Sequence, residues 1–406
     1  MAGFIRGSTA DEKPLADLVG FLPNLDSIDR SKVRIVRFDR KMTDLDPASV
    51  RRMQTEAGYL CPAGNRNCDA QESHIDQALR NVADGDAKSL SIVVSDLWLA
   101  NSEVLTTDGV ALSKPLADIF ASGRSVAVYG FESPYDGRVS DLPSGDTAVK
   151  AQRRYLFLVV AGPVDRLQAF HRVMQNAPSS SISNALRSGK AHYSLFTLDP
   201  VVSASDGTQA FELQSKSPLT KKAFLAVRTG VRVPQYQLDR GKALRAGGAG
   251  KVPGARWQGT PETSILPGAV WEGTSQGSTK LYRQSGDKCL PDGGDWREEG
   301  TFPGGWPTDG TAGFSLDPSE LATLPPDRYL LVGTVRRTSL RSPNPATQWM
   351  RDWSFDASTE QAAVKRQTMP TLNLSETARL LEIALLKSAE AKPMNIGGFA
   401  VAVEIE

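Results

Sequence analysis

Carboxylates that follow predicted strands are the first residues in this sequence whose type and position suggest chemistry. Asp39 ends the run VRIVRFD, and Asp96 ends the run LSIVVSD. Ligands of a parallel α/β sheet collect at the edge where the carboxyl ends of the strands meet. Carboxylates at that edge, with a hydroxyl such as that of Ser102, are hard oxygen ligands suited to Mg²⁺ or Mn²⁺. Two interpretations stay open. Asp39, Asp96 and Ser102 form a weak metal site, or the protein has no cofactor and both aspartates cap helices or lie in loops, which is the outcome we expect.

A second group of polar side chains lies in the segment GFESPYDGRVSDL, residues 130–142. The segment follows a predicted buried strand, so we expect Glu132, Tyr135, Asp136 and Arg138 to form a binding rim at the carboxyl end of that strand. Its acids could also serve acid–base chemistry. The alternative is a plain turn around Tyr135 and Asp136 that joins the sheet to the next element.

Nucleophilic catalysis has little support in the sequence. The chain has three histidines, His74, His171 and His192, and neither a Gly-x-Ser-x-Gly nor a His-Glu-x-x-His motif. A metal-assisted hydrolase of the phosphoesterase kind remains the alternative function. It would use Asp39 and Asp96 together with either Asp108 or Glu132.

The cysteines leave three interpretations open. Cys61 and Cys68 lie close together in the turn-rich stretch CPAGNRNC, and the third cysteine is Cys289. They are free thiols, which we favour, or Cys61 and Cys68 close a short disulfide loop, or these two cysteines bind a metal with His74. A zinc site is the least favoured, because no second pair of closely spaced ligands exists.

Alternating apolar strands and amphipathic helices predict an α/β domain over residues 1–177. Continuous apolar strands separated by helices are typical of a parallel sheet with helices on both faces, as in Rossmann-like folds. The predicted strands are 33–39, 90–96, 125–131 and 155–161, and the predicted helices are 74–83, 110–121 and 164–174.

The motifs VRFDRKMT, SIVVSD and SVAVYGF, in that order, resemble a von Willebrand factor A-type domain over about residues 30–175. In that family, an Asp-x-Ser-x-Ser motif after the first strand and an aspartate after a later strand bind a metal that bridges to a partner's carboxylate. Asp39 and Thr43 occupy the first motif here, with Arg40 and Lys41 between them, and Asp96 matches the later aspartate. The resemblance implies a mostly parallel sheet and a protein partner.

The rest of the chain, 178–406, predicts a β-rich domain with long loops rich in Gly, Pro and Trp. Short strands are separated by such stretches, above all 241–311, which is typical of a β-sandwich or an open barrel. A helix over 374–389 and a strand over 398–405 end the chain. The sequence leaves open whether this last strand pairs with the first sheet.

Charge and hydropathy limit the partners. The formal net charge is +1, the first 14 residues lack the apolar run of a signal peptide, and no run approaches the ~18 apolar residues of a membrane span. We therefore expect a cytoplasmic protein without a membrane partner. The basic segment 228–256 is either a solvated linker or a contact for nucleic acid or an acidic partner.

Six of the seven tryptophans lie in the C-terminal half, where they either fill irregular β cores or form a binding surface. With no catalytic motif, we expect a non-enzymatic binding or scaffold protein that acts through protein–protein contacts, alone or as part of a larger assembly.

Overall fold

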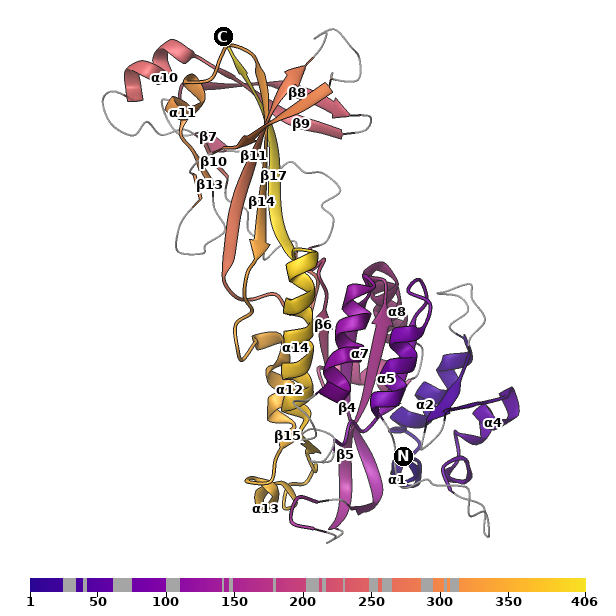
Figure 1. Cartoon of the computed structure of the whole chain (residues 1–406). Helices are drawn as coiled ribbons and strands as arrows, with labels where there is room; N and C mark the ends of the chain where they lie inside the picture. Colours follow the sequence, from indigo (N-terminus) through magenta and orange to yellow (C-terminus); the bar gives the residue numbers. More distant parts are fainter. Residues whose placement is uncertain are drawn as a thin grey trace. The chain divides into compact units, whose positions relative to one another are not determined.

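The computed structural model describes residues 1–24, 34–38, 42–60, 75–99, 110–140, 142–145, 149–177, 180–201, 212–213, 217–228, 231–247, 255–257, 265–285, 295–302, 305–306 and 314–406. The chain forms two compact units. Unit 1 comprises residues 1–198, 267–270 and 342–392, and unit 2 comprises residues 199–266, 271–341 and 393–406. The predicted boundary after residue 177 differs from this division, since the segment 342–392 belongs to the first unit (Figure 1).

Unit 1 is built on a four-stranded sheet with the strand order β3-β5-β4-β6. Every neighbouring pair is antiparallel. The two longest strands, β4 and β5, are paired along most of their length. The strands are β3 (Ser91–Ser95), β4 (Ser125–Val139), β5 (Val149–Gly162) and β6 (Ala191–Phe196).

The prediction of a mostly parallel, Rossmann-like sheet is therefore wrong. Strands β3 and β4 do point the same way, as a strand–helix–strand pattern requires, because both are antiparallel to β5. Strand β5, however, follows β4 as a hairpin and lies between β3 and β4. The apolar runs are continuous because both faces of the sheet are covered, which is true of buried antiparallel strands as well as of parallel ones.

One face of this sheet, which we call the Tyr129 face, packs against α8 (Val164–Asn176) and α9 (Ser181–Ser188). Leu167, Phe170 and Met174 recur at helical spacing on α8 and are all buried. The ring of Phe170 meets that of Tyr129 edge-on at 5.9 Å. Two short N-terminal helices, α1 (Ala2–Gly7) and α2 (Pro14–Phe21), complete this part, with the 3-10 turn η1 (Leu22–Asn24).

The opposite face, which we call the Gly130 face, is covered by helices that lie far apart in the sequence. Helices α5 (Ile75–Asp84), α7 (Val110–Ala121) and α14 (Leu374–Ala391) meet Val93 and Val159 around an apolar gap of about 20 Å³. Beside them, Trp349 of α12 (Gln348–Asp352) and Trp353 lie over Gly130. The Trp349 indole donates a hydrogen bond of 2.7 Å to the Ser194 hydroxyl.

Smaller elements of unit 1 connect these layers. Strands β1 (Val36–Phe38) and β2 (Met42–Asp44) form a separate two-stranded ribbon, so the strand predicted over 33–39 is not part of the main sheet. The remaining elements are α4 (Pro47–Arg52), η2 (Glu56–Gly58), η4 (Pro345–Thr347), β15 (Ser354–Phe355), α13 (Glu360–Ala363) and β16 (Thr371–Leu372).

Unit 2 is a six-stranded sheet with the order β12-β11-β14-β17-β9-β8 and a three-stranded sheet with the order β13-β10-β7. The last strand of the chain, β17, lies inside the larger sheet, antiparallel to β14 and parallel to β9. It therefore joins the second sheet and not the first. The elements are β7 (Glu212–Leu213), β8 (Leu219–Arg228), β9 (Val231–Leu238), α10 (Arg240–Gly247), β10 (Ala255–Trp257), β11 (Ser275–Ser285), β12 (Asp295–Thr301), β13 (Phe314–Leu316), α11 (Pro318–Ala322), β14 (Arg328–Arg337) and β17 (Asn395–Ile405).

Aromatic side chains from within unit 2 cover one face of the six-stranded sheet. The rings of Trp306 and Phe314 pack on Phe399 of β17, at centroid distances of 6.0 and 4.9 Å. The indole of Trp306 also donates a hydrogen bond of 3.0 Å to Thr279. Among the helices that the structure describes, none is both long and apolar enough to cross a bilayer.

The close packing over Gly130 generates a stability prediction. A Cβ at this position would lie 2.5 Å from a ring carbon of Trp349 and 2.6 Å from one of Trp353. We expect Gly130→Ala to lower the free energy of unfolding by about 1–3 kcal/mol, because rigid rings must move. The control is Gly20→Ala in α2, where the new Cβ meets only the amide end of Gln54. Chemical denaturation should find the control neutral or slightly stabilised, and equal effects of the two substitutions would contradict the packing.

Candidate functional site

The residues predicted from the sequence to form sites fall into three groups. Asp39, Ser102 and Asp108 lie outside the described residues. Asp96 follows β3, as predicted. The four predicted rim residues lie within strand β4 and not beyond its carboxyl end, so their predicted position is wrong, as is the alternative of a simple turn. Tyr135 and Asp136 fall where the register between β4 and β5 shifts, which is the position of a β-bulge.

Arg154 of β5 brings two of the predicted residues together. Its Nη1 lies 3.1 Å from Oδ2 of Asp96, and the side chain of Arg154 is only 6% exposed. The guanidinium carbon lies 4.9 Å from the ring centroid of Trp98 and 5.2 Å from that of Tyr135. Phe4 of α1 is slightly farther away, at 6.0 Å. Asp96 and Tyr135 therefore belong to one buried cluster around an arginine, which the sequence analysis missed.

The electrostatics of this cluster favour a charged Asp96. Burial is the largest single influence and raises the pKa of Asp96, but the opposing influences, of which the Arg154 guanidinium is the largest, hold the pKa below its usual value. Hydrogen bonds from backbone N–H groups act in the same direction. A divalent cation bound at Asp96 would have to approach the Arg154 guanidinium, which already pairs with the carboxylate. The geometry thus supports a structural ion pair more than a metal ligand.

The other predicted rim residues are also engaged within unit 1. Glu132 accepts hydrogen bonds from Arg153 Nε at 2.5 Å and from the Thr368 hydroxyl at 2.8 Å. Arg153 also donates to Glu12 at 2.6 Å, and the hydrogen bond to Glu12 is the main cause that raises the pKa of Arg153. The network therefore ties three distant parts of the chain, around residues 12, 132–153 and 368, to one another.

Asp136 and Arg138 lie in the same stretch of β4. The carboxylate of Asp136 is 3.9 Å from Lys150 across the hairpin. The Tyr135 hydroxyl donates a hydrogen bond of 3.2 Å to the backbone carbonyl of Arg138. A role of these residues in binding a partner stays a prediction, since the observed contacts are those of a strand–strand connection.

Metal and nucleophile chemistry can be assessed only for part of the chain. Within the described ranges, no group of three or more His, Cys, Asp and Glu side chains could hold a metal ion. His74 and the three cysteines lie outside those ranges, so the thiol, disulfide and metal interpretations stay predictions. His171 and His192 are structural. His171 lies 3.2 Å from the Tyr129 hydroxyl, His192 stacks on Trp349, and burial lowers the pKa of both imidazoles.

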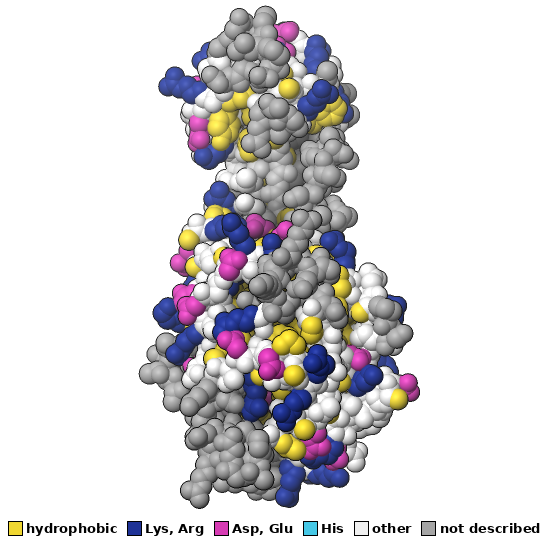
Figure 2. All heavy atoms as spheres, turned by 90° about the vertical axis from the view of Figure 1, so that its right-hand side faces the viewer, with side chains coloured by type: hydrophobic (Ala, Val, Ile, Leu, Met, Phe, Trp, Pro, Cys, Tyr) yellow, Lys and Arg dark blue, Asp and Glu magenta, His cyan; other side chains and the backbone are white. Residues whose placement is uncertain are grey.

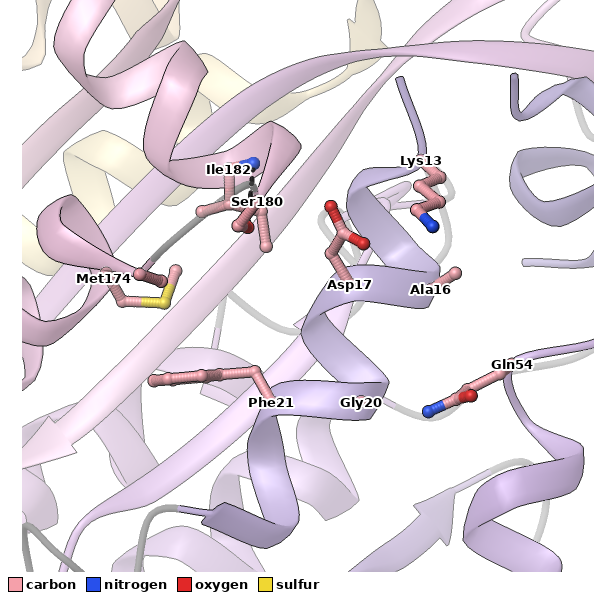
Figure 3. Close-up of a pocket in the computed structure, with 10 residues that line it drawn as sticks. Lys13, Ala16, Asp17, Gly20, Phe21, Gln54, Met174, Ser180 and Ile182 are labelled. Carbon is pink, nitrogen blue, oxygen red and sulfur yellow. Dashed lines mark hydrogen bonds between the residues drawn. The ribbon is translucent and has the colours of Figure 1, made fainter. Parts of the chain in front are cut away.

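A surface pocket of about 400 Å³ lies on unit 1, and sequence reasoning missed it (Figure 3). One face of α2 forms its centre, where the small residues Ala16 and Gly20 leave the helix backbone open. Gln54 stands on one side of α2, and residues of α8 and α9 stand on the other. The remaining lining residues are Lys13, Asp17, Phe21, Met174, Ala177, Ser180 and Ile182. The only available signal in the sequence was the spacing of Ala16 and Gly20 on one helical face.

Unit 2 carries a second candidate surface, which we call the aromatic sheet face. It is the face of the six-stranded sheet opposite Phe399. Three buried residues at its centre, Val233, Leu330 and Ala402, are surrounded by larger side chains that are only partly buried. All of its members come from strands of the sheet itself. The surrounding residues are Leu225, Val227, Tyr282, Trp296, Val332 and Ala400.

Ion pairs lie at the border of the aromatic sheet face. Arg328 lies two residues from Leu330 on β14 and therefore on the same face. It lies 3.2 Å from Glu404 of the neighbouring strand. Lys280, which is paired with Val332 across the sheet, lies 2.9 Å from Glu298 of β12. Arg328 and Lys280 are thus each paired with a carboxylate of a neighbouring strand.

The basic segment 228–256 is not one continuous loop, since β9 and helix α10 lie within it. Asp239 accepts a hydrogen bond of 2.9 Å from the Lys242 N–H at the start of α10. On the face of the molecule drawn in Figure 2, basic and acidic side chains are interspersed, without an extended area of one sign. Nucleic-acid binding through this segment stays a prediction.

Comparison of the chain with protein-family models, curated proteins and solved structures yields no match. The resemblance to a von Willebrand factor A-type domain therefore gains no support from relatives. The mostly parallel sheet that it implied is absent from the described part of unit 1. Function must be argued from the geometry of this chain alone.

The Asp96–Arg154 pair generates a second prediction. We expect Arg154→Met to lower the free energy of unfolding by about 3 kcal/mol, because it leaves the Asp96 carboxylate buried without its partner. The control is Asp118→Asn, which removes an exposed pair with Lys114 (2.7 Å) and should cost less than about 1 kcal/mol.

The pH dependence of stability gives an independent check on the same pair. Because the pKa of Asp96 is lower in the folded state than in the unfolded state, its stabilising effect is present above the unfolded pKa and is lost as the pH falls through the folded pKa. Urea unfolding should therefore show wild type more stable than Asp96→Asn by a constant margin at pH 5–7. That margin should shrink below about pH 4. A margin that does not change with pH would show that the carboxylate is not held in its charged form.

Proposed function

We propose that this protein is a non-enzymatic binding or scaffold protein that acts through protein–protein contacts, and that the aromatic sheet face of unit 2 is its contact surface. The observation that carries the proposal is the group of large apolar side chains, Leu225, Val227, Tyr282, Trp296 and Val332, that stay partly exposed around a buried centre. A contiguous apolar patch bordered by polar residues is typical of an interaction site.

The chemistry of the face fits that of protein interfaces. Such interfaces have an apolar centre from which charged residues are depleted, and a polar rim. Tryptophan and tyrosine contribute most often to binding energy, because they bury a large rigid area at small cost in side-chain entropy. Tyr282 and Trp296 supply these rings on neighbouring strands, while the pairs Arg328–Glu404 and Lys280–Glu298 supply the rim.

The partner that this face suits best is a second copy of the chain. Arg328 and Lys280 at the rim are each paired within the sheet, and the whole chain carries a formal net charge of only +1, so the net charge opposes the association of two copies very little. Two sheets can pack face to face with interdigitating side chains at a separation of about 10 Å. A twofold dimer uses the same patch on both copies, which requires a surface complementary to itself. The result would be a β-sandwich formed between copies.

The metal-assisted hydrolase has less support. Asp96 is paired with Arg154, and Glu132 accepts hydrogen bonds from Arg153 and Thr368. Each carboxylate would have to leave its partner before it could bind a metal or transfer a proton. Asp39 and Asp108, which the hydrolase would also use, lie outside the described residues. We therefore keep the binding function as the proposal.

Neighbouring residues of β8 provide a matched test. Leu225 belongs to the aromatic sheet face, whereas Phe224 points to the other side of the strand and is 50% exposed. We expect sedimentation velocity to show a monomer–dimer equilibrium for wild type in the micromolar range. Leu225→Glu should weaken the dimer at least tenfold, because a carboxylate would be buried in the interface. Phe224→Glu should leave the dimer unchanged.

Two outcomes would contradict the proposal. The first is a wild-type chain that stays monomeric at all accessible concentrations. The second is a dimer that Leu225→Glu and Phe224→Glu weaken equally. Thermal melts of both variants must match wild type, so that a loss of association is not a loss of folding.

A further inference from the structure

The pocket on α2 carries an inference that is independent of the proposed contact surface. Its lining combines a cation, a carboxylate and an amide with an apolar wall, and a volume of about 400 Å³ is within the range of small-molecule sites. The question is which class of ligand these groups fit.

The two charged groups of the pocket do not neutralise each other. Lys13 and Asp17 are four residues apart, a spacing that often gives an ion pair on a helix. Asp17 instead turns to α9, where its Oδ2 accepts hydrogen bonds from the N–H of Ser181 at 2.8 Å and from its hydroxyl at 2.7 Å. No ion pair joins Lys13 to any other residue in the part of the chain that the structure describes. Lys13 is exposed and thus able to bind an anion at the rim.

The carboxylate of Asp17 keeps capacity for a cationic group. Both hydrogen bonds from Ser181 go to Oδ2, and a carboxylate oxygen accepts more than one bond. In Figure 3, Lys13 lies just before α2 and Asp17 lies in its first turn, and Gln54 lies across the helix from Met174. A ligand over Ala16 and Gly20 would therefore meet a positive and a negative group side by side.

The apolar wall of the pocket indicates that the ligand also carries an apolar group. Phe21 extends toward Met174 in Figure 3, and Met174 and Ile182 are almost fully buried, with exposures of 1% and 2%. Phe21, which is partly exposed and lies next to these buried residues, therefore supplies the apolar surface that a hydrocarbon group can cover.

We propose that this pocket binds a small zwitterion with an apolar side chain, of the α-amino-acid type. The ligand carboxylate pairs with Lys13, its ammonium pairs with Asp17, and its side chain lies against Phe21. Gln54 can donate a further hydrogen bond to the carboxylate from the opposite side. A simple carboxylate would meet Asp17 without a donor, and a simple amine would leave Lys13 without its anion.

Truncated ligands test this assignment without changing the protein. Ligand-observed NMR titrations would compare L-phenylalanine with 3-phenylpropionate, which lacks the ammonium, and with 2-phenylethylamine, which lacks the carboxylate. We expect L-phenylalanine to bind at least tenfold more tightly than either analogue, since each lost charged hydrogen bond weakens binding by about that factor. Equal binding of the three compounds, or no binding of L-phenylalanine at millimolar concentration, would overturn the assignment.

Three variants locate the site. Ala16→Phe, which fills the centre of the pocket, should abolish binding of L-phenylalanine. Lys13→Ala should remove the advantage of L-phenylalanine over 2-phenylethylamine. Lys190→Ala, an exposed lysine outside the pocket, is the control and should change nothing. Unaltered binding in Ala16→Phe, with an unaltered melting temperature, would show that any zwitterion binds elsewhere.

Discussion

Both faces of the four-stranded sheet in unit 1 are apolar, and the need to cover them is the constraint on which the rest of this unit depends. The Tyr129 face is covered by α8 and α9, which lie next to the strands in the sequence. The Gly130 face needs α12 and α14, which follow after more than one hundred residues of a different unit. Burial of apolar area contributes about 25 cal/mol per Å², so an uncovered face of this size would leave the sheet unstable. The segment 342–392 therefore belongs to the first unit although it follows most of the second.

The same constraint explains why the residues predicted as sites have become structural connections. Strands β4 and β5 extend well beyond the covered centre of the sheet, and their outer ends carry charged side chains. Arg153 and Arg154, at adjacent positions of β5, point to opposite faces and bind Glu132 and Asp96 respectively. Each pair holds another part of the chain against the hairpin, through Glu12 in one case and through the rings of Phe4 and Trp98 in the other. The chemistry that remains accessible lies at the surface, on the aromatic sheet face and in the pocket on α2.

The sequence predicted local elements well and their long-range arrangement poorly. The 3.6-residue periodicity identified α5, α7, α8 and α14 within a few residues of their observed bounds, because it depends only on which face of a helix is buried. Pairing depends on contacts between distant residues, and nothing in the run SVAVYGF distinguishes a parallel neighbour from an antiparallel one. The segment 130–142 was predicted to follow the strand as a binding rim or a turn, since Asp136 and Gly137 are turn formers. In the structure, a register shift in the paired strand accommodates them.

The candidate sites also depend on contacts between distant residues, which local sequence patterns do not predict. Asp96 was correctly placed at the end of a strand, but its partner Arg154 is 58 residues away, and the local pattern of β5 gives no sign of the pairing. The aromatic sheet face is assembled from six strands, each of which contributes one or two residues. Its members cannot be grouped until the register is known. Tryptophans likewise take either role: Trp349 and Trp353 fill the core of unit 1, whereas Trp296 stays partly exposed.

The most direct test of the proposed contact surface is a measurement of side-chain accessibility at two protein concentrations. Hydroxyl-radical footprinting with mass spectrometry would compare a dilute and a concentrated sample of the full chain. If the aromatic sheet face joins two copies, the modification rates of Tyr282 and Trp296 must fall at the higher concentration. Those of Phe224 and Leu244, which are 50% and 51% exposed and lie outside this face, must stay constant. Unchanged rates at Tyr282 and Trp296, or an equal fall at all four residues, would contradict the proposal.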